Sequence, residues 1–245
     1  MDATDGRPRR EAPGLPTSAV LGARDALLDR VQITVRPIAS PSMLGLFGLA
    51  GGTLTLAGLQ LGWVAPAQGK QVAIVLIGFA AVAQVLASVL ATFARDGVVS
   101  TAMGVLGLSW LVIGLVLYTS PPGTRSKALG LFLVFTATAM TLIGLTAALA
   151  KLVPALVFVT AALRFALTAV YELAGGEGWK TAAGVSGLPL FVLAMYGAFA
   201  LLVEGATAKT VLPIGRRGRG ALAVHGSLLE QIQDTPAEPG VRVQL

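Results

Sequence analysis

The chain has 245 residues, of which 55% are hydrophobic and only 12% are charged, and its formal net charge is +6 at pH 7. Soluble domains carry about 25% charged residues, so this composition argues against a water-soluble globule. The sequence contains no cysteine, which excludes disulfides, thiolate metal sites and cysteine nucleophiles. Nucleic acid is not needed to explain the basic excess, because lysine and arginine fall where membrane topology places them.

Residues 1–37 are predicted to form a cytoplasmic tail that is mostly disordered. They include Arg7, Arg9 and Arg10 and several prolines, with no apolar core behind the basic residues, so they are not a secretory signal peptide. Residues 17–35 fit either a short helix on the membrane surface or an unstructured linker.

Five long stretches without any charged residue follow this tail, and a sixth contains one charge, Arg164. Each stretch is long enough for a membrane-spanning helix, which needs about 20 mostly apolar residues. The chain is therefore predicted to be an all-α, polytopic membrane protein with six transmembrane helices, at 43–64, 71–94, 98–118, 129–150, 152–173 and 184–206.

Lysine and arginine are distributed unevenly between the two sides of these spans. The tails and the loops at Arg95 and Lys151 hold 13 basic residues, whereas the opposite side holds 4. The positive-inside rule then places both termini in the cytoplasm. The basic run at 215–219 fits a lipid-headgroup anchor, with protein docking as the alternative, and residues 216–245 are predicted to be a second cytoplasmic tail.

The predicted spans lack the groups that membrane-embedded catalysis requires. The single histidine, His225, lies in the tail, and the acidic residues of the spans, Glu172 and Glu204, lie near predicted helix ends. No base, carboxylate pair or metal cluster can be assembled from them. We therefore expect no enzyme activity, no cofactor and no metal site, and passage of a solute is the favoured class of function.

Small residues recur at helical spacing in the spans. Pairs of glycines occur at Gly48 and Gly52 in the first span, at 104 and 107 in the third and at 184 and 187 in the sixth. Such pairs allow helix backbones to approach closely, which predicts a compact bundle.

Arg164 stands out because it lies near the middle of the fifth span, where a charge costs about 2.5–3.5 kcal/mol on insertion scales. It should face water, a partner or the interior of the bundle. Two readings remain open: Arg164 lines a wet path for anions, or it hydrogen-bonds free carbonyls or extends outward.

The two ends of the predicted membrane region carry recognisable motifs. The sequence Ser40-Pro41-Ser42-Met43-Leu44-Gly45-Leu46 resembles the Asn-Pro-x-Pro-Leu-Gly-Leu signature of the succinate and acetate permease family, also called the acetate uptake transporters. The segment 209–215 is similar to the closing Leu-Pro-(Val/Ile)-Gly of that family. Residues between the motifs also match family members, among them Gln84, Thr101, Trp110, Gly184, Gly187 and Tyr196.

This resemblance covers about residues 38–215 and implies a transporter domain of six helices, assembled as a hexamer in the cell membrane, by expectation a prokaryotic inner membrane. The implied substrates are acetate and related short monocarboxylates or succinate, in some members moved together with protons. No carboxylate or histidine is available as a proton relay, so coupling would use the undissociated acid or water. Alternatives are a non-transporting scaffold or sensor on the same fold, or ammonia transport.

The family path is narrowed by a Phe-Tyr-Leu constriction, and the matching positions here are Leu49, Leu106 and Ala161. Each is smaller than, or lacks the ring of, the family residue. The neck should therefore be wider, and admit lactate or succinate, unless neighbouring side chains fill the space. Arg164 also departs from the family, whose residue there is apolar, and it follows Ala161 on much the same helix face.

The implied substrate pathway thus includes Leu49, Leu106, Ala161, Arg164, Gln84, Thr101 and Tyr196, with the opening motif at Ser40, Pro41 and Gly45. Ser40 replaces the asparagine of the family motif and is expected to cap the first helix. The working hypothesis is that Arg164 offsets the cost of dehydrating a carboxylate at the neck.

Overall fold

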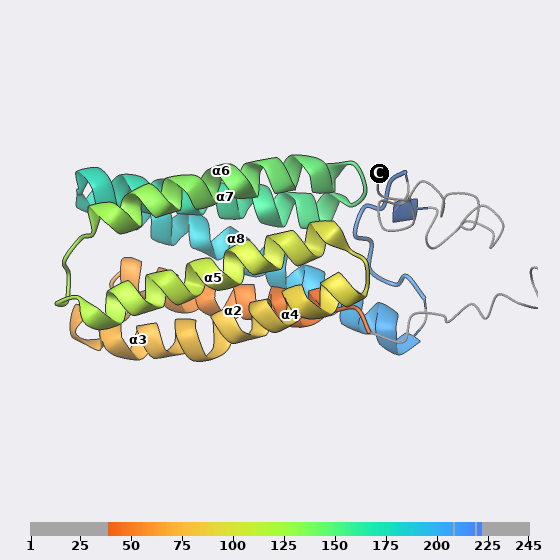
Figure 1. Ribbon diagram of the computed structural model, residues 1–245, viewed down its shortest axis with the longest axis horizontal. Helices are drawn as coiled ribbons and strands as arrows, with labels where there is room; N and C mark the ends of the chain where they lie inside the picture. Colours follow the sequence, from red (N-terminus) through yellow and green to blue (C-terminus); the bar gives the residue numbers. More distant parts are fainter. Residues whose placement is uncertain (1–38, 208, 219, 222–245) are drawn as a thin grey trace, which may run out of the picture. The chain divides into compact units, whose positions relative to one another are not determined.

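The computed structural model describes residues 39–207, 209–218 and 220–221, so the predictions for residues 1–37 and for most of the second tail lie outside the described residues. These ranges contain helices and one isolated β-bridge but no strand. The elements are α2 (Ser42–Gln60), η1 (Pro66–Gln68), α3 (Gly69–Val75), η2 (Leu76–Ala81), α4 (Val82–Phe93), α5 (Gly97–Thr119), α6 (Lys127–Ala148), α7 (Leu152–Ala174) and α8 (Glu177–Thr207) (Figure 1).

The predicted all-α fold with six membrane spans is confirmed. The segments η1, α3, η2 and α4 follow one another as a single helix of 28 residues, Pro66–Phe93, with a π-helical turn at η2. Together with α2 and α5 to α8 it makes six helices long and apolar enough to cross a membrane. The chain is a multi-pass membrane protein.

The largest difference from the predicted bounds is at the last helix, which begins at Glu177 rather than at 184. The charged residues Glu177 and Lys180 lie outside the predicted span, but Lys180 Nζ lies 3.1 Å from Glu177 Oε2, one helical turn away. This pairing lets α8 continue past the apolar stretch. Pro189 lies inside α8 and does not end it.

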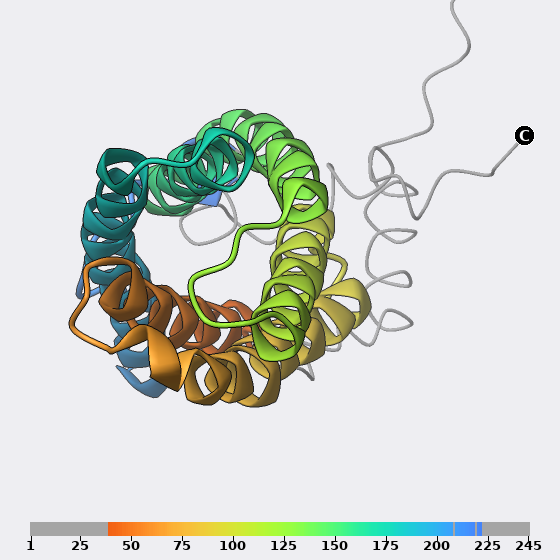
Figure 2. The ribbon, with the colours of Figure 1, turned by 90° about the vertical axis from the view of Figure 1, so that its left-hand side faces the viewer.

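The six spans form a closed ring in which each helix packs on two neighbours, in the order α2, α4, α5, α6, α7, α8 and back to α2. Figure 2 shows this ring end-on, with the α5–α6 connection crossing its mouth. We call the end where α2 begins and α8 ends the tail end. The opposite end, which carries the α2–η1, α5–α6 and α7–α8 connections, is the cavity end.

Glycines allow the close helix contacts that the sequence predicted. A Cβ on Gly48 would lie 2.9 Å from the Ala83 Cβ, and one on Gly107 would lie 2.9 Å from Val85 Cγ2. A Cβ on Gly184 would lie 2.7 Å from Leu61 Cγ. At these distances a side chain cannot be added without a shift, so the ring depends on glycine where α2 meets α4 and α8, and where α5 meets α4.

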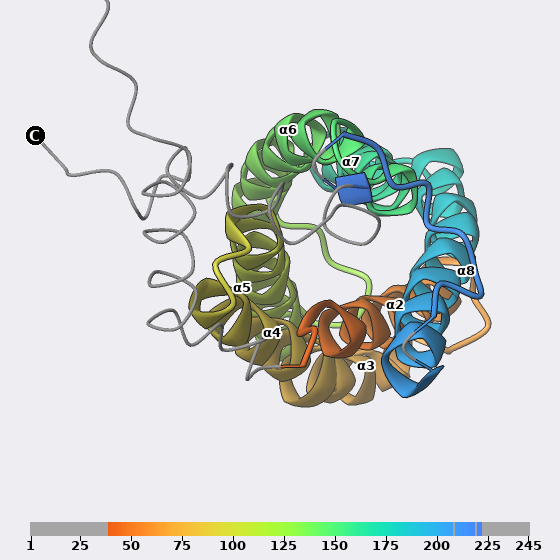
Figure 3. The ribbon, with the colours of Figure 1, turned by 90° about the vertical axis from the view of Figure 1, so that its right-hand side faces the viewer.

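The closing motif 212–215 has a structural role at the tail end. Residues 209–218, which we call the C-terminal strap, follow the rim from α8 toward α7 (Figure 3). The amides of Leu152 and Val153 donate to the carbonyls of Gly215 and Ile214, at 3.0 and 3.1 Å. Gly215 has a φ of 66°, which favours glycine.

Arg216 fixes the strap through its side chain. Its Nη2 lies 2.6 Å from Glu204 Oε1 and 2.7 Å from Oε2, and its Nη1 donates to Thr210 Oγ1 at 3.1 Å. Arg216 is therefore paired within the protein, a contact that depends on the turn after α8, and headgroup anchoring by the rest of the basic run stays a prediction.

Candidate functional site

Four helices bring buried stripes of residues to the interior of the ring. Within each stripe the residues are spaced three or four apart, as one face of a helix requires. The stripes are Leu49, Thr53, Leu56 and Gln60 on α2; Met103, Leu106, Trp110 and Ile113 on α5; Leu129, Leu133, Thr136 and Met140 on α6; and Phe158, Ala161, Phe165 and Thr168 on α7.

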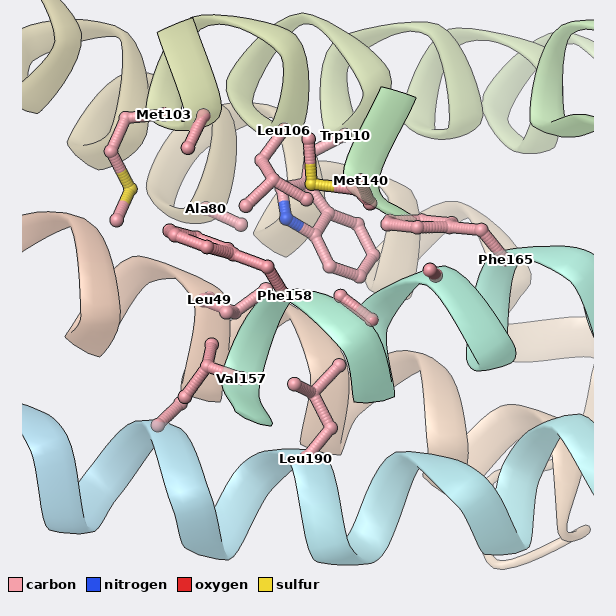
Figure 4. Packing of buried hydrophobic residues seen from close by; sticks show 14 of the residues in the cluster. Leu49, Ala80, Met103, Leu106, Trp110, Met140, Val157, Phe158, Phe165 and Leu190 are labelled. Atoms are coloured by element: carbon pink, nitrogen blue, oxygen red, sulfur yellow. The ribbon is translucent and has the colours of Figure 1, made fainter. Parts of the chain in front are cut away.

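The three positions matched to the family constriction meet in this interior. Leu49, Leu106 and Ala161 are each 0% exposed and belong to one apolar cluster. Figure 4 shows the rings of Phe158 and Trp110 directed into the same region. Neighbouring side chains thus fill the space that the smaller residues leave, and the neck is closed rather than widened.

Some polar atoms at the neck are left without partners. Trp110 Nε1 and Thr53 Oγ1 are buried and make no hydrogen bond within the described part of the chain. Ser109 and Thr136 approach each other at 3.2 Å between their hydroxyl oxygens, and each also donates to its own helix. The Trp110 ring packs on Phe165 with centroids 5.8 Å apart.

A cavity of about 110 Å³ occupies the cavity end of the ring. Its wall is mainly apolar toward the neck and polar toward the mouth, where Thr124, Glu172 and Lys180 contribute. The lining residues are Leu56, Leu59, Gln60, Pro66, Ile113, Val116, Leu117, Ser120, Pro121, Gly123, Thr124, Leu129, Leu133, Thr168, Tyr171, Glu172 and Lys180.

A hydrogen-bonded group of three side chains adjoins this cavity. Gln60 Nε2 donates to Thr168 Oγ1 at 3.3 Å, and Gln60 Oε1 accepts from Arg164 Nη2 at 3.2 Å. The Thr168 hydroxyl donates to the Arg164 carbonyl at 2.9 Å. Gln60 and Thr168 line the cavity, whereas Arg164 does not.

Arg164 is completely buried between α7, α2 and α8. Its Nη1 donates to the Ala183 carbonyl of α8 at 3.5 Å, and a Cβ on Gly187 would collide with the guanidinium. Its Nε has no partner among the described residues. Of the two readings, the structure shows the carbonyl contact, and the guanidinium reaches the cavity only through Gln60.

The mouth of the cavity is bordered by the α5–α6 connection, 120–126. Glu172 Oε2 accepts a hydrogen bond of 2.6 Å from the Ser126 backbone amide. The Arg125 guanidinium lies against Gly175, whose φ is 81° and which would not admit a side chain there. The connection is therefore attached to the end of α7.

Three of the residues expected on the pathway are not among the residues that line the cavity. Gln84 donates to the Gly45 carbonyl at 3.3 Å and so joins α4 to α2. The Tyr196 hydroxyl donates to the Pro213 carbonyl at 2.8 Å and holds the C-terminal strap. Thr101 is exposed on α5. They matched family members by position, but sequence likeness does not distinguish packing from lining.

The opening motif also differs from expectation. Helix α2 begins at Ser42, its N-cap residue is Pro41, and no side chain caps it. Ser40 is therefore not the cap. The Gly45 amide donates to the Pro41 carbonyl at 3.2 Å, and Gly45 packs on Met103, so the motif fixes the start of α2.

Gln60, which lines the cavity and contacts Arg164, is not among the residues expected on the pathway, because it carries no charge and no family motif includes it. The signal was present, since Gln60 follows Leu49 by about three helical turns and shares its face. Within the described ranges, no group of three histidine, aspartate or glutamate side chains is placed to bind a metal ion.

Comparison with known proteins identifies the fold and the family. The model of the GPR1/FUN34/yaaH family matches residues 28–215. The solved structure of the bacterial acetate channel SatP is similar, with 26% identity and a TM-score of 0.66 over 73% of this chain and 99% of that one. No curated protein sequence matches. The expected resemblance is confirmed: the chain belongs to the GPR1/FUN34/yaaH family.

Proposed function

We propose that this protein transports acetate and related short carboxylates, monocarboxylates or succinate, across a membrane through the lumen of its own six-helix ring. The observation that carries the proposal is the likeness to an acetate channel over 99% of that chain, together with a cavity inside the corresponding ring. A solute entering at the cavity end meets Gln60 and Thr168 first and the neck second.

The neck of Leu49, Leu106 and Ala161 forms the barrier in this proposal. With Phe158 and Trp110 it excludes water, so a carboxylate has to lose hydration there and the rings have to move for passage. Arg164 supplies a positive charge behind the cavity wall, which favours anions over cations. We leave Gln84 and Tyr196 out of the pathway because their contacts hold helices and strap together, and Thr101 because it is exposed on α5.

We further propose that residues 38–215 form the transport domain, with both termini in the cytoplasm of a prokaryotic cell and the ring in its inner membrane. The uneven distribution of lysine and arginine supports this orientation. The cavity then opens away from the cytoplasm.

A homo-oligomer, a hexamer by family resemblance, is part of the same proposal. An apolar groove of about 480 Å³ runs between α6 and α7 and is lined by small residues such as Ala137, Thr138, Ala162 and Ala166. Small residues suit close packing of a helix from a second copy. Native mass spectrometry of the detergent-purified protein would test the number of copies.

Uptake of labelled acetate by proteoliposomes tests the proposed function. Purified protein should accelerate uptake well above empty liposomes, and Arg164→Leu should reduce that rate sharply in folded protein. Ammonium in place of acetate tests the alternative cargo. Equal acetate uptake by proteoliposomes and empty liposomes would reject carboxylate transport and favour a scaffold or sensor.

A further inference from the structure

We propose that Gln60 is the residue that binds the carboxylate in the cavity, and that Arg164 acts as a positioning residue that orients and polarises its amide. This inference rests on the proposed function, since it names the group that recognises the transported anion. It is built on three contacts that join α2, α7 and α8.

The contacts of the Gln60 side chain fix the orientation of its amide group. A guanidinium has hydrogen-bond donors and no acceptor. The group of Gln60 that faces Arg164 Nη2 must therefore be the carbonyl oxygen, Oε1, at 3.2 Å. The NH2 group is then turned away from Arg164, toward Thr168 and the cavity that both residues line.

That NH2 group has two hydrogens, and one of them is bonded to Thr168. The Thr168 hydroxyl donates its own hydrogen to the Arg164 carbonyl, so its oxygen acts as the acceptor for one hydrogen of Gln60 Nε2. The other hydrogen of Nε2 has no partner within the described residues. An amide donor is thus presented beside the cavity, held in place at both ends.

The buried positive charge of Arg164 favours an anion in the adjoining cavity. No acidic side chain in the described ranges forms a salt bridge with Arg164, which is 0% exposed. A buried charge without a counter-ion is costly, and an anion one amide away would offset part of that cost. A guanidinium bonded to Oε1 also strengthens the amide as a donor, because hydrogen bonds in a chain polarise one another.

The surroundings limit the ligand to a small carboxylate with an apolar tail. Leu56, Ile113 and Leu133 line the same cavity and suit a methyl or short alkyl group. At the mouth, Glu172 already accepts the Ser126 amide and Lys180 is paired with Glu177. Of the two buried polar side chains in the lining, Gln60 and Thr168, Gln60 is therefore the one with a hydrogen left for a carboxylate oxygen.

The decisive variant is Gln60→Glu. A carboxylate at this position gives Arg164 a counter-ion, so a merely structural role for Gln60 predicts a stable protein with unchanged transport. Our proposal predicts a folded protein whose melting temperature is at least that of the wild type but whose initial acetate uptake falls at least about tenfold, because a charge-assisted donor is replaced by an acceptor. Gln68→Glu, an exposed residue at the same end, should match the wild type.

A double variant keeps the proposal testable if Gln60→Glu does not fold. Gln60→Met with Arg164→Met removes both partners and leaves no buried charge, a change that costs little stability. Its acetate uptake should also fall at least about tenfold. Uptake within about twofold of the wild type in either folded variant would overturn the inference, because that change is below the loss of one such hydrogen bond.

Arg164 is tested through the acetate concentration that gives half-maximal uptake. Arg164→Met should raise this concentration, and Arg164→Lys should restore part of the loss, because lysine keeps a positive donor. Equal values in wild type and folded Arg164→Met would overturn the positioning role. Wild-type uptake no faster than empty liposomes would instead reject the proposed function, so the two failures are distinguishable.

Discussion

The two halves of the lumen use the same helices but different side chains. Toward the cavity end, α2 and α7 contribute Gln60 and Thr168, and a cavity remains between the helices. Toward the neck the same two helices contribute Leu49 and Ala161, and the interior is filled. On α2, Leu49 and Gln60 lie about three helical turns apart. The region around Gln60 is suited to recognising an anion, and the region around Leu49 is suited to excluding water.

In the proposed function, this difference makes one narrow ring selective for carboxylates and impermeable to water and ions. Polar groups near the neck would let water and ions through, whereas an entirely apolar lumen would not attract a carboxylate. The positive charge of Arg164 lies behind the wall, and the charged side chains that line the cavity itself, Glu172 and Lys180, lie at its mouth.

The largest effect is expected for Phe158→Ala, which opens the neck. Removing this buried ring should lower the free energy of unfolding by about 3–5 kcal/mol. It should also admit succinate, measured as competition with labelled acetate uptake. Phe135→Ala, on the exposed face of α6, should change neither property. Unaltered competition in folded Phe158→Ala would show that this ring is not part of the barrier.

A smaller effect is expected where Arg164 meets α8. Gly187→Ala places a methyl group against the guanidinium, so it should displace Arg164 from Gln60 and cost about 1–3 kcal/mol of stability. Gly205→Ala, in the same helix with open space around it, should be neutral or slightly stabilising. Thermal unfolding in detergent compares the two. Equal melting temperatures would argue that Arg164 has room to move.

The smallest effect is expected at the C-terminal strap, which is remote from both halves of the lumen. Glu204→Gln weakens a partly buried ion pair with Arg216 and should cost about 1 kcal/mol. Glu177→Gln changes an exposed pair and should be silent in thermal unfolding. Acetate uptake should be unchanged in Glu204→Gln, and a loss of uptake there would tie the strap to the pathway.

Much of the fold could be predicted from the sequence, because it follows from composition and spacing. Five charge-free stretches and one with a single charge located the six spans, glycine pairs marked close helix contacts, and the cost of a charge in lipid placed Arg164 inside the bundle. Leu49, Leu106 and Ala161, matched through the resemblance to the family, are all buried in one apolar cluster, and their role as a constriction stays a prediction.

The site could be predicted only in part, because it depends on which side chains meet across helices. Phe158 fills the space next to Ala161 from one turn away, which spacing alone does not reveal. Gln60 gains its importance from Arg164 and Thr168 on another helix. Tyr196 matched the family but holds the strap, since packing residues and pathway residues look alike in sequence.

The central claim, that acetate passes through the lumen, is tested most directly by introducing one cysteine into this cysteine-free chain. Leu117→Cys places a thiol in the cavity wall, and Trp63→Cys places one on the exposed α2–η1 connection at the same end. A bulky, charged thiol reagent should stop acetate uptake through Leu117→Cys and leave the wild type and Trp63→Cys unaffected. Full labelling of Leu117→Cys with undiminished uptake would contradict the account.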